Sequence, residues 1–258
     1  MAQFQALPLP TTLQFADLAD LADSLGAAFC SSPAYWYVLK DTVSASERQS
    51  ALAWLLQRNV WLHLAEDCCF ALRKRDLPTA LLPRCPELAD DKVVCYFMLI
   101  NRGQRKPLRL WELVTNGLLL LPFYYGWAAA RRLLYILDQG DSKKAEVWPD
   151  TEATATEATA TEAKPLTTYY LHNMIVHPSM QGCKVGSTCL EQALHGIRDR
   201  HSPAHPARVT LTTQEARNVT FYQRLGFRVV AETDCPDKDQ PSKMAYHDWY
   251  MQLDYHQG

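Results

Sequence analysis

A strand, a glycine-containing turn and a helix follow one another from Thr167 onward, and this unit constrains the fold of the chain most strongly. Residues 167–176, TTYYLHNMIV, are rich in aromatic and apolar side chains, as is typical of a strand. Residues 187–200 repeat apolar side chains at helical spacing, and the run MQGCKVGST joins the two segments. The first turn of such a helix has unpaired backbone N–H groups and the positive end of the helix dipole. The turn is therefore predicted to bind an anion.

Two common nucleotide-binding loops do not fit this turn. A Walker loop requires GxxxxGK[ST], but only three residues separate Gly182 from Gly186 and no lysine follows Gly186. The turn also lacks the GxGxxG fingerprint of dinucleotide-binding folds. The expected anion is therefore not the phosphate of ATP or of NAD.

The rest of the chain alternates predicted strands and helices. After the turn, the pattern predicts a strand over 208–213, a helix over 217–225 that ends at Gly226, and strands over 227–232 and 246–253. Before the turn, we expect an edge strand over 4–9 and then a helix capped by Thr11 and Thr12. A loop with three aromatic residues at 35–37 should follow. It leads into a helix over 46–67 and strands over 68–73 and 92–100.

Two segments are predicted to be additions to a single domain that spans residues 1–258. Residues 103–138 read as an inserted helical pair, interrupted near Pro122. The apolar run over 117–130 is shorter than the roughly 20 residues that a membrane span needs, so we expect a buried or groove-lining helix pair and no membrane span. Residues 141–166 contain a TEATA repeat whose period fits neither a helix nor a strand, and they are predicted to form a flexible linker.

Composition excludes several classes of protein. The formal net charge of -2 and the pI near 6.4 provide no positive field that would attract nucleic acid. The eight cysteines show no CxxC spacing, so reduced thiols are expected, without disulfides and without a structural metal. The first residues lack the pattern of a secretory signal, so the expected location is cytoplasmic. The oligomeric state is left open.

Two linked motifs resemble the GNAT N-acetyltransferase superfamily. They are IVHPSMQGCKVGSTCLEQAL and, after an intervening strand, EARNVTFYQRLGFRVV, and the resemblance covers roughly residues 169–232. The residues at the matching motif positions are Val176, Pro178, Gln181, Gly186, Asn218, Tyr222, Gly226 and Phe227. The resemblance implies an α/β fold with a mixed, mainly antiparallel sheet flanked by helices. Lys184 departs from the pattern, because the family usually has glycine there; we expect it on the first helical turn with an ordinary φ.

The resemblance also implies the site. Acetyl-CoA is the expected acyl donor, with its pyrophosphate on the turn and its pantetheine arm along the backbone of the preceding strand. The implied contacts with acetyl-CoA are Met174, Ile175, Val176, Gln181, Gly182, Cys183, Lys184, Val185, Gly186, Ser187 and Asn218. The acetyl group passes directly to an amine, and the Tyr222 phenol is the candidate acid that protonates the leaving thiolate. His172 is the candidate base, on the same strand face as Met174 if alternation is regular, and water is an equal alternative.

The predicted activity is N-acetylation of a small-molecule amine. An aromatic acceptor pocket is hypothesised from Tyr35, Trp36, Tyr124 and Tyr125, although core packing explains each of them equally well. The alternatives are a protein or peptide N-acetyltransferase and a non-catalytic acyl-CoA-binding module. The sequence leaves open the acceptor, N- versus O-acetylation and the length of the acyl chain.

Overall fold

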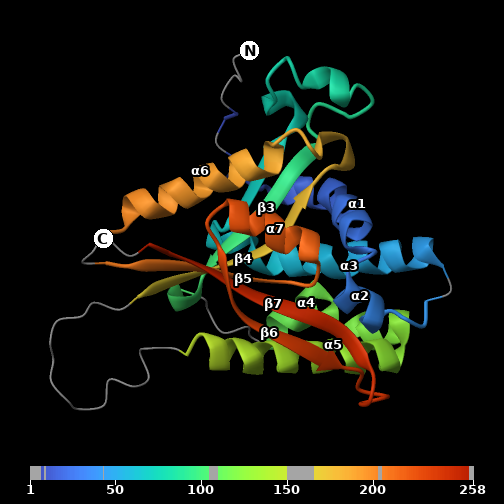
Figure 1. Ribbon diagram of the computed structural model, residues 1–258. Coiled ribbons are helices and arrows are strands. Elements are labelled where there is room, and N and C mark those ends of the chain that lie inside the picture. Colours follow the sequence, from blue (N-terminus) through green and yellow to red (C-terminus); the bar gives the residue numbers. More distant parts are fainter. Residues whose placement is uncertain are drawn as a thin grey trace, which may run out of the picture.

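One seven-stranded sheet organises the protein (Figure 1). The computed structural model describes residues 7–8, 10–42, 44–104, 110–149, 166–202 and 205–255. The strand order is β1-β2-β3-β4-β5-β7-β6, and every neighbouring pair is antiparallel except β4 and β5. The predicted mixed, mainly antiparallel sheet is therefore confirmed. The strands are β1 (Thr11–Thr12), β2 (Cys69–Arg73), β3 (Val93–Asn101), β4 (Thr167–Val176), β5 (Ala207–Thr213), β6 (Arg228–Pro236) and β7 (Met244–Tyr255).

Helices cover both faces of the sheet, as Figure 1 shows. The helices are α1 (Leu18–Phe29), α2 (Pro33–Val38), α3 (Ala45–His63), α4 (Leu110–Asn116), α5 (Leu121–Val147), α6 (Val185–Arg200) and α7 (Ala216–Arg224). On one face, α6 and α7 pack on a cluster that includes Val94, Leu171 and Val209, which we call the first core. On the other face, α1, α3 and α5 enclose a second core that includes Leu21, Leu52 and Ile175. The sheet thus separates two apolar layers.

Local sequence explains where several helices begin. Ser44 and Glu47 form a capping box before α3, in which each side chain accepts a hydrogen bond from the other residue's backbone N–H, at 3.1 and 3.2 Å. Pro33 occupies the first turn of α2, where its missing N–H leaves no bond unmade. The aromatic residues 35–37 therefore lie in a helix, and the prediction of a loop there is wrong.

The N-terminal segment also differs from the prediction. Thr11 and Thr12 pair with β2 as a short edge strand instead of capping a helix. The first α-helix begins only at Leu18, after the turn over 15–17. Of the predicted strand over 4–9, residues 7 and 8 form no strand, and the other four lie outside the described residues.

The inserted helices lie between β3 and β4, and their interruption is not where it was predicted. Pro122 lies in the first turn of α5, which suits its fixed φ, whereas the helix is broken at Gly126, with φ of 86°. The helix continues to Val147, so residues 141–147 are helical and do not belong to a linker. The TEATA repeat lies outside the described residues.

Several large apolar side chains of α5 face outward, so the predicted helix pair is buried only in part, although Tyr124 and Tyr125 line a cavity. Phe123, Tyr124 and Trp127 are 75%, 63% and 67% exposed. The helix packs inward through Ala129 and Ala130, whose small side chains let it approach the second core and its neighbours closely. Within the described part of the chain, the search finds no helix with the length and apolarity of a membrane span.

Close packing of α1 against α3 depends on Gly26. A Cβ at this position would lie 2.4 Å from the carbonyl oxygen of Gln49 and 3.0 Å from the Cβ of Ala53. We expect Gly26→Ala to lower the free energy of unfolding by about 1–3 kcal/mol, because α1 must move away from α3.

The matched control for this change is Gly140→Ala in α5, where a Cβ would meet nothing within 4 Å. This variant should be more stable than the parent by about 0.5–1 kcal/mol, since alanine favours the helix. Urea unfolding followed by circular dichroism measures both changes. Equal stability of the two variants would show that the α1–α3 contact is not tight.

Candidate active site

The predicted anion-binding turn connects β4 to α6. A short 3₁₀ helix, η7 (Pro178–Met180), follows β4, and residues 181–184 lead into α6. The Nε2 of Gln181 donates to the carbonyl of Val176 at 3.2 Å and so holds the turn against the end of the strand. The N–H of Thr188 donates to the carbonyl of Lys184, so the N–H groups of residues 185–187 precede the first bond of the helix. Those three donors and the helix dipole form a site suited to a phosphate group.

Lys184 does not have the conformation that we expected. It caps α6 with φ of 60° and ψ of 9°, in the left-handed region, rather than lying on the first helical turn with an ordinary φ. Such a conformation costs a non-glycine residue roughly 1–2 kcal/mol. The glycine usual in the family would avoid this cost.

Gly186 brings the start of α6 into direct contact with β4. A Cβ on this residue would lie 2.7 Å from the Cγ2 of Val176 and 3.3 Å from the Cε of Met174. No larger residue fits without moving the helix away from the strand. The unpaired N–H groups are thereby held beside the end of β4.

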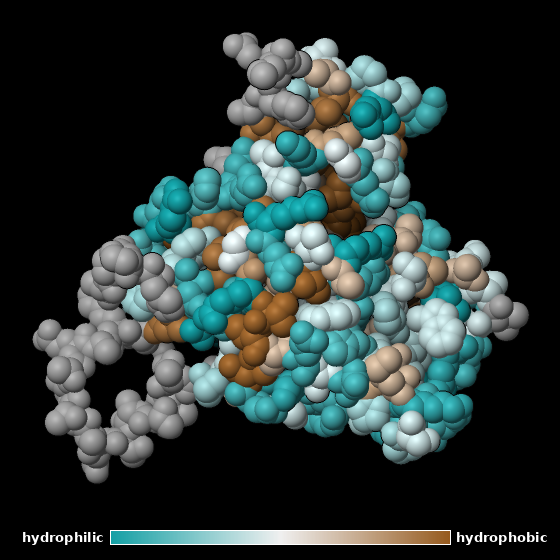
Figure 2. Space-filling view, viewed as in Figure 1, coloured by the Kyte–Doolittle hydropathy of each residue, from teal (hydrophilic) through white to brown (hydrophobic). Residues whose placement is uncertain are grey.

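β4 separates from β5 after four residue pairs. The parallel register runs from Thr167↔Ala207 to Tyr170↔Thr210, and the rest of β4 is paired only with β3. The edge of residues 173–176 that faces β5 is therefore open to an extended ligand that bonds it as an additional strand would. Figure 2 shows an apolar hollow in the surface where β4 and α1 approach one another.

A bulge in β4 changes which face its side chains occupy. Tyr96 pairs with Ile175 but Met98 pairs with His172, so Phe97 alone lies opposite the two residues 173 and 174. Within this bulge, Asn173 has a φ of 52°. The side chain of Asn173 donates to the Oδ1 of Asn59 at 3.0 Å, which anchors the bulge to α3.

The predicted position of His172 is therefore wrong. Leu171 before the bulge and Met174 after it both pack on the first core, so alternation is not regular and His172 does not share a face with Met174. The imidazole instead stacks on Tyr170, with ring centroids 5.6 Å apart.

The α7 helix carries Asn218 and Tyr222 toward the gap between β4 and β5. The Nδ2 of Asn218 donates to the Oγ1 of Thr213 at the end of β5, at 3.2 Å. The Tyr222 ring packs edge-to-face against Phe221 and Phe227. Burial, and then the nearby Tyr170 phenol, raise the pKa of Tyr222 above its ordinary value.

Tyr170 was not predicted, yet it lies at the point where the two strands part. Its hydroxyl is 2.8 Å from the Oγ1 of Thr212, and it lies near enough to raise the pKa of both Tyr222 and Tyr35, in each case after the larger effect of burial. The Lys144 ammonium of α5 lies over its ring, 4.9 Å from the centroid. The YY pair within TTYYLHNMIV could have indicated Tyr170 as a site residue. Successive side chains of a strand point to opposite faces, so one tyrosine of the pair must face the α5 side of the sheet.

The four aromatic residues hypothesised for the acceptor pocket occupy different environments. Tyr124 and Tyr125 line a cavity of about 590 Å³ together with Asp41 and Glu47. Tyr35 and Tyr125 both pack on the small apolar cluster of Leu55, Leu121 and Ala130. Trp36 is 50% exposed and lies under the Arg48 guanidinium.

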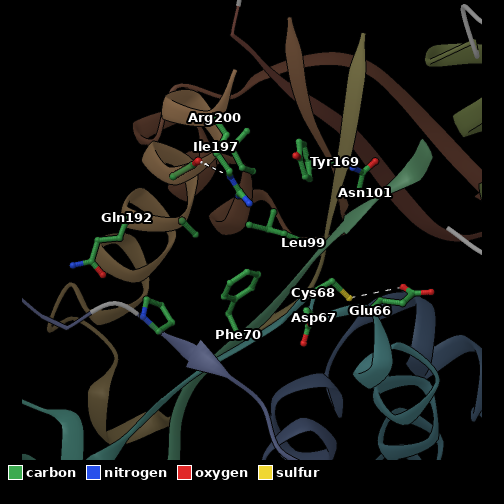
Figure 3. A pocket seen from close by; sticks show the side chains of 13 residues that line it. Glu66, Asp67, Cys68, Phe70, Leu99, Asn101, Tyr169, Gln192, Ile197 and Arg200 are labelled. Atoms are coloured by element: carbon green, nitrogen blue, oxygen red, sulfur yellow. Dashed lines mark hydrogen bonds between the residues drawn. The ribbon is translucent and has the colours of Figure 1, made fainter. Parts of the chain in front are cut away.

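A second cavity, of about 480 Å³, lies beside the C-terminal half of α6 (Figure 3). Gln192, Ile197 and Arg200 of α6 line it, as do Phe70 and Leu99 of the sheet. None of the predicted acetyl-CoA contacts lies on its wall.

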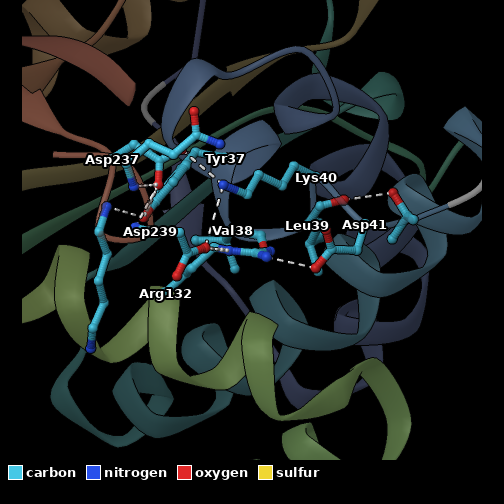
Figure 4. A network of polar contacts seen from close by, with 11 residues as sticks. Tyr37, Val38, Leu39, Lys40, Asp41, Arg132, Asp237 and Asp239 are labelled. Carbon is cyan, nitrogen blue, oxygen red and sulfur yellow. Dashed lines mark hydrogen bonds and ion pairs between the residues drawn. The ribbon is translucent and has the colours of Figure 1, made fainter. Parts of the chain in front are cut away.

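A network of charged side chains fixes α2 against α5 (Figure 4). The buried Arg132 guanidinium donates to the carbonyl of Val38 and to the carboxylates of Asp41 and Asp239, at 3.2, 2.6 and 3.2 Å. The Lys40 ammonium lies 2.8 Å from Asp237, and its hydrogen bond holds the pKa of Asp237 below its ordinary value. The connection between β6 and β7 is thus tied to the cavity that Tyr124 and Tyr125 line.

Comparison with known proteins adds independent support to the sequence motifs. A family model described as "Acetyltransferase (GNAT) domain" matches residues 142–229, which include β4, the turn, α6 and α7. A search of curated proteins finds no match.

Solved structures share the fold over nearly the whole chain. A polyamine N-acetyltransferase of Drosophila melanogaster superposes with a TM-score of 0.54 at 12% identity, covering 96% of this chain and 99% of that one. The apo form of an agmatine N-acetyltransferase mutant superposes with a TM-score of 0.52 at 12% identity, covering 95% of this chain and 98% of that one. The mosquito protein named arylalkylamine N-acetyltransferase like 5b superposes with a TM-score of 0.52 at 10% identity, covering 95% of this chain and 99% of that one. Residues 142–229 thus match the GNAT acetyltransferase domain, and the chain as a whole shares its fold with solved N-acetyltransferases.

Proposed function

We propose that this protein transfers the acetyl group of acetyl-CoA directly to an amine of a small molecule. The observation that carries the proposal is the free edge of β4, which runs from the split at Tyr170 to the unpaired N–H groups of α6. The pantetheine arm would bond the backbone of Met174, Ile175 and Val176, and the pyrophosphate would bind residues 181–187. Gly186 supports this fit, because a Cβ there would fill the space at the helix start. In this proposal the chain is one acetyltransferase domain, with α4 and α5 inserted between β3 and β4.

The proposed chemistry assigns a role to each polar group near the split. The amine attacks the thioester carbonyl, and Tyr222 donates its proton to the departing thiolate. His172, or water at the split, takes the proton that the amine must lose. Asn218 holds the start of α7 against β5 through Thr213, so that Tyr222 keeps its position.

The acceptor would enter from the α5 side of the sheet. The cavity lined by Tyr124 and Tyr125 presents aromatic rings against which a small-molecule amine would pack; its two carboxylates, Asp41 and Glu47, already bond Arg132 and the Ser44 N–H. Tyr125 and Tyr35 pack on one cluster, and the Tyr170 phenol lies near enough to Tyr35 to raise its pKa, after the larger effect of burial, so this cluster lies between the cavity and the split. The acyl acceptors named for the similar structures, agmatine, polyamines and arylalkylamines, are amines of this kind.

The direct test measures release of free CoA thiol with acetyl-CoA and a panel of amines. Agmatine, spermidine and tyramine represent the three acceptor classes, and a lysine-containing peptide represents the protein alternative. Turnover with a small amine supports the proposal. Turnover with the peptide alone, or acetyl-CoA binding in calorimetry without thiol release from any acceptor, would support one of the two alternatives.

Gly186 tests the acetyl-CoA site. We expect Gly186→Ala to raise the Kd for acetyl-CoA at least about tenfold, because overpacking of 1–3 kcal/mol moves the helix start away from β4. The control is Gly196→Ala on the same helix, where an added Cβ meets nothing within 4 Å. Calorimetric titration measures both; similar Kd values would exclude the turn as the pyrophosphate site.

Lys184 tests the conformational cost in the turn. Lys184→Gly should raise the free energy of unfolding by about 1 kcal/mol, because glycine tolerates a φ of 60°. Lys184→Asn serves as the comparison, since asparagine also tolerates this region and likewise removes the charge. If the ammonium contributes to phosphate binding, both variants lose about 0.3–1 kcal/mol of acetyl-CoA affinity. Tighter binding by Lys184→Gly alone would show that lysine distorts the turn.

Tyr222 tests the proposed acid. Because burial raises its pKa, the phenol stays protonated above its ordinary range, and the parent kcat should show no decline from this group below about pH 10. Tyr222→Phe should lower kcat about 10²-fold across pH 7–10, with little change in KM.

The control for this prediction is Tyr169→Phe. The Tyr169 hydroxyl lies 3.1 Å from the Nε2 of His201 on the first-core side of the sheet, and this variant should keep its kcat. Equal kcat values for Tyr222→Phe and the parent protein at every pH would remove Tyr222 from the mechanism.

A further inference from the structure

Three different metal-ligating side chains meet at the wall of the cavity beside α6. His63 ends α3, Glu66 ends the short 3₁₀ helix η2 (Leu64–Glu66), and Cys68 immediately precedes β2. The Nδ1 of His63 lies 2.9 Å from the Oε2 of Glu66, and the Sγ of Cys68 lies 4.0 Å from the same oxygen. All three donor atoms lie within 4.8 Å of one another. Figure 3 shows Glu66 and Cys68 directed toward each other.

The backbone between these residues explains why they converge. Asp67 has a φ of 49°, which reverses the chain between η2 and β2 and brings Glu66 and Cys68 to the same side. The carbonyl of Cys68 accepts a hydrogen bond from the N–H of Leu99 at 2.8 Å, so the sheet holds the cysteine in place. His63 and Cys68 are only 4% and 5% exposed. Two of the three donors are therefore fixed by the core.

We propose that His63, Glu66 and Cys68 bind a divalent transition metal, with zinc the preferred ion. Imidazole nitrogen, carboxylate oxygen and thiolate sulfur are the three donor types that zinc takes in proteins. In a tetrahedral site, donors at 2.0–2.3 Å from the ion lie roughly 3.3–3.6 Å apart. The two distances to Oε2, 2.9 and 4.0 Å, bracket this range, and the His63 and Cys68 donors, within 4.8 Å of each other, would have to draw together around the ion. Binding replaces the His63–Glu66 hydrogen bond and releases the thiol proton of Cys68 to solvent.

The fourth position of this site would face the cavity, because Glu66 and Cys68 line its wall. A closed structural site has four protein ligands, whereas three ligands and an open position leave room for water or a small ligand. The proposed metal site does not depend on the proposed acetyl transfer. Its three residues belong to the α3–β2 connection, and none of them belongs to the turn or α7.

Among the residues described, no other group of His, Cys, Asp and Glu side chains converges in this way. A plain ion pair between His63 and Glu66 accounts for the 2.9 Å contact alone. It does not account for the Cys68 sulfur beside the pair: the thiol donates to the backbone carbonyl of His63 at 3.6 Å and also lies 4.0 Å from the Glu66 oxygen. The sequence predicted no metal because its cysteines lack CxxC spacing, whereas the spacing here, H-x₂-E-x-C, mixes three donor types.

The test uses the full chain after removal of metals with a chelator and measures binding of Co²⁺ as a spectroscopic probe. Coordination by Cys68 gives a sulfur-to-cobalt charge-transfer band in the near ultraviolet, which one equivalent of Zn²⁺ should abolish by displacement. Cys68→Ser should remove the band. Glu66→Gln, at an exposed carboxylate, should keep the sulfur signal but weaken Co²⁺ binding at least about tenfold.

The control is Cys30→Ser, which removes a partly exposed thiol that lies outside the proposed site and should leave the band unchanged. Circular dichroism of each variant verifies folding, and Glu66→Gln keeps the test decisive if Cys68→Ser fails to fold. A parent protein without the band, or a band that persists in Cys68→Ser, would overturn the proposal. Equal Co²⁺ affinity of Glu66→Gln and the parent protein would also overturn it.

Discussion

The separation of β4 from β5 after Tyr170 is the constraint on which the candidate active site depends. A parallel pair that continued to Val176 would use the backbone groups that a pantetheine arm needs. The bulge at Asn173 accompanies the separation, and its bond to Asn59 ties the strand to α3 instead of to β5. The proposed site is therefore a property of the backbone, and side-chain identity in the MIV segment matters mainly for packing on the two cores.

The two faces of the sheet contribute different parts of this arrangement. On one face, α6 and α7 approach the split, and the close contact at Gly186 leaves no room for the helix to move toward the strand. On the other face, a buried arginine, Arg132, is surrounded by a carbonyl and two carboxylates from segments far apart in the sequence. Removing its partners would leave a buried charge unpaired, so the network specifies how α2, α5 and the β6–β7 connection fit together. The α5 side of the sheet is thus held by charge and the α6 side by steric contact.

Sequence reasoning succeeded where a pattern reflects local physics. Strand composition, helical spacing and the glycine turn located β4, α6 and α7, because each depends on residues close together in the chain. It failed at Asn173, since alternation in TTYYLHNMIV carries no sign of the extra residue that moves His172 away from the face of Met174. It failed again at residues 35–37, where a loop was predicted, and only in part at 117–130, where a buried or groove-lining pair was predicted and several apolar side chains are exposed while others line a cavity. Whether such residues pack inward depends on the neighbouring helices, which sequence alone does not place.

The two unusual positions of the turn, 184 and 186, illustrate why a family motif tolerates one change better than another. At Lys184 the left-handed backbone conformation costs roughly 1–2 kcal/mol of free energy. Two hydrogen bonds that hold the turn offset it: the Cys183 N–H donates to the Met180 carbonyl, and the Ser187 hydroxyl donates to the Lys184 carbonyl. At Gly186 the cost of a side chain would be a collision with two residues of β4, and no local bond can offset a displaced helix. Torsional strain leaves the position of the N–H groups intact, whereas displacement removes them from the strand end. The glycine at 186 is therefore the one that this architecture requires, and lysine at 184 is compatible with the position of the N–H groups at the start of α6.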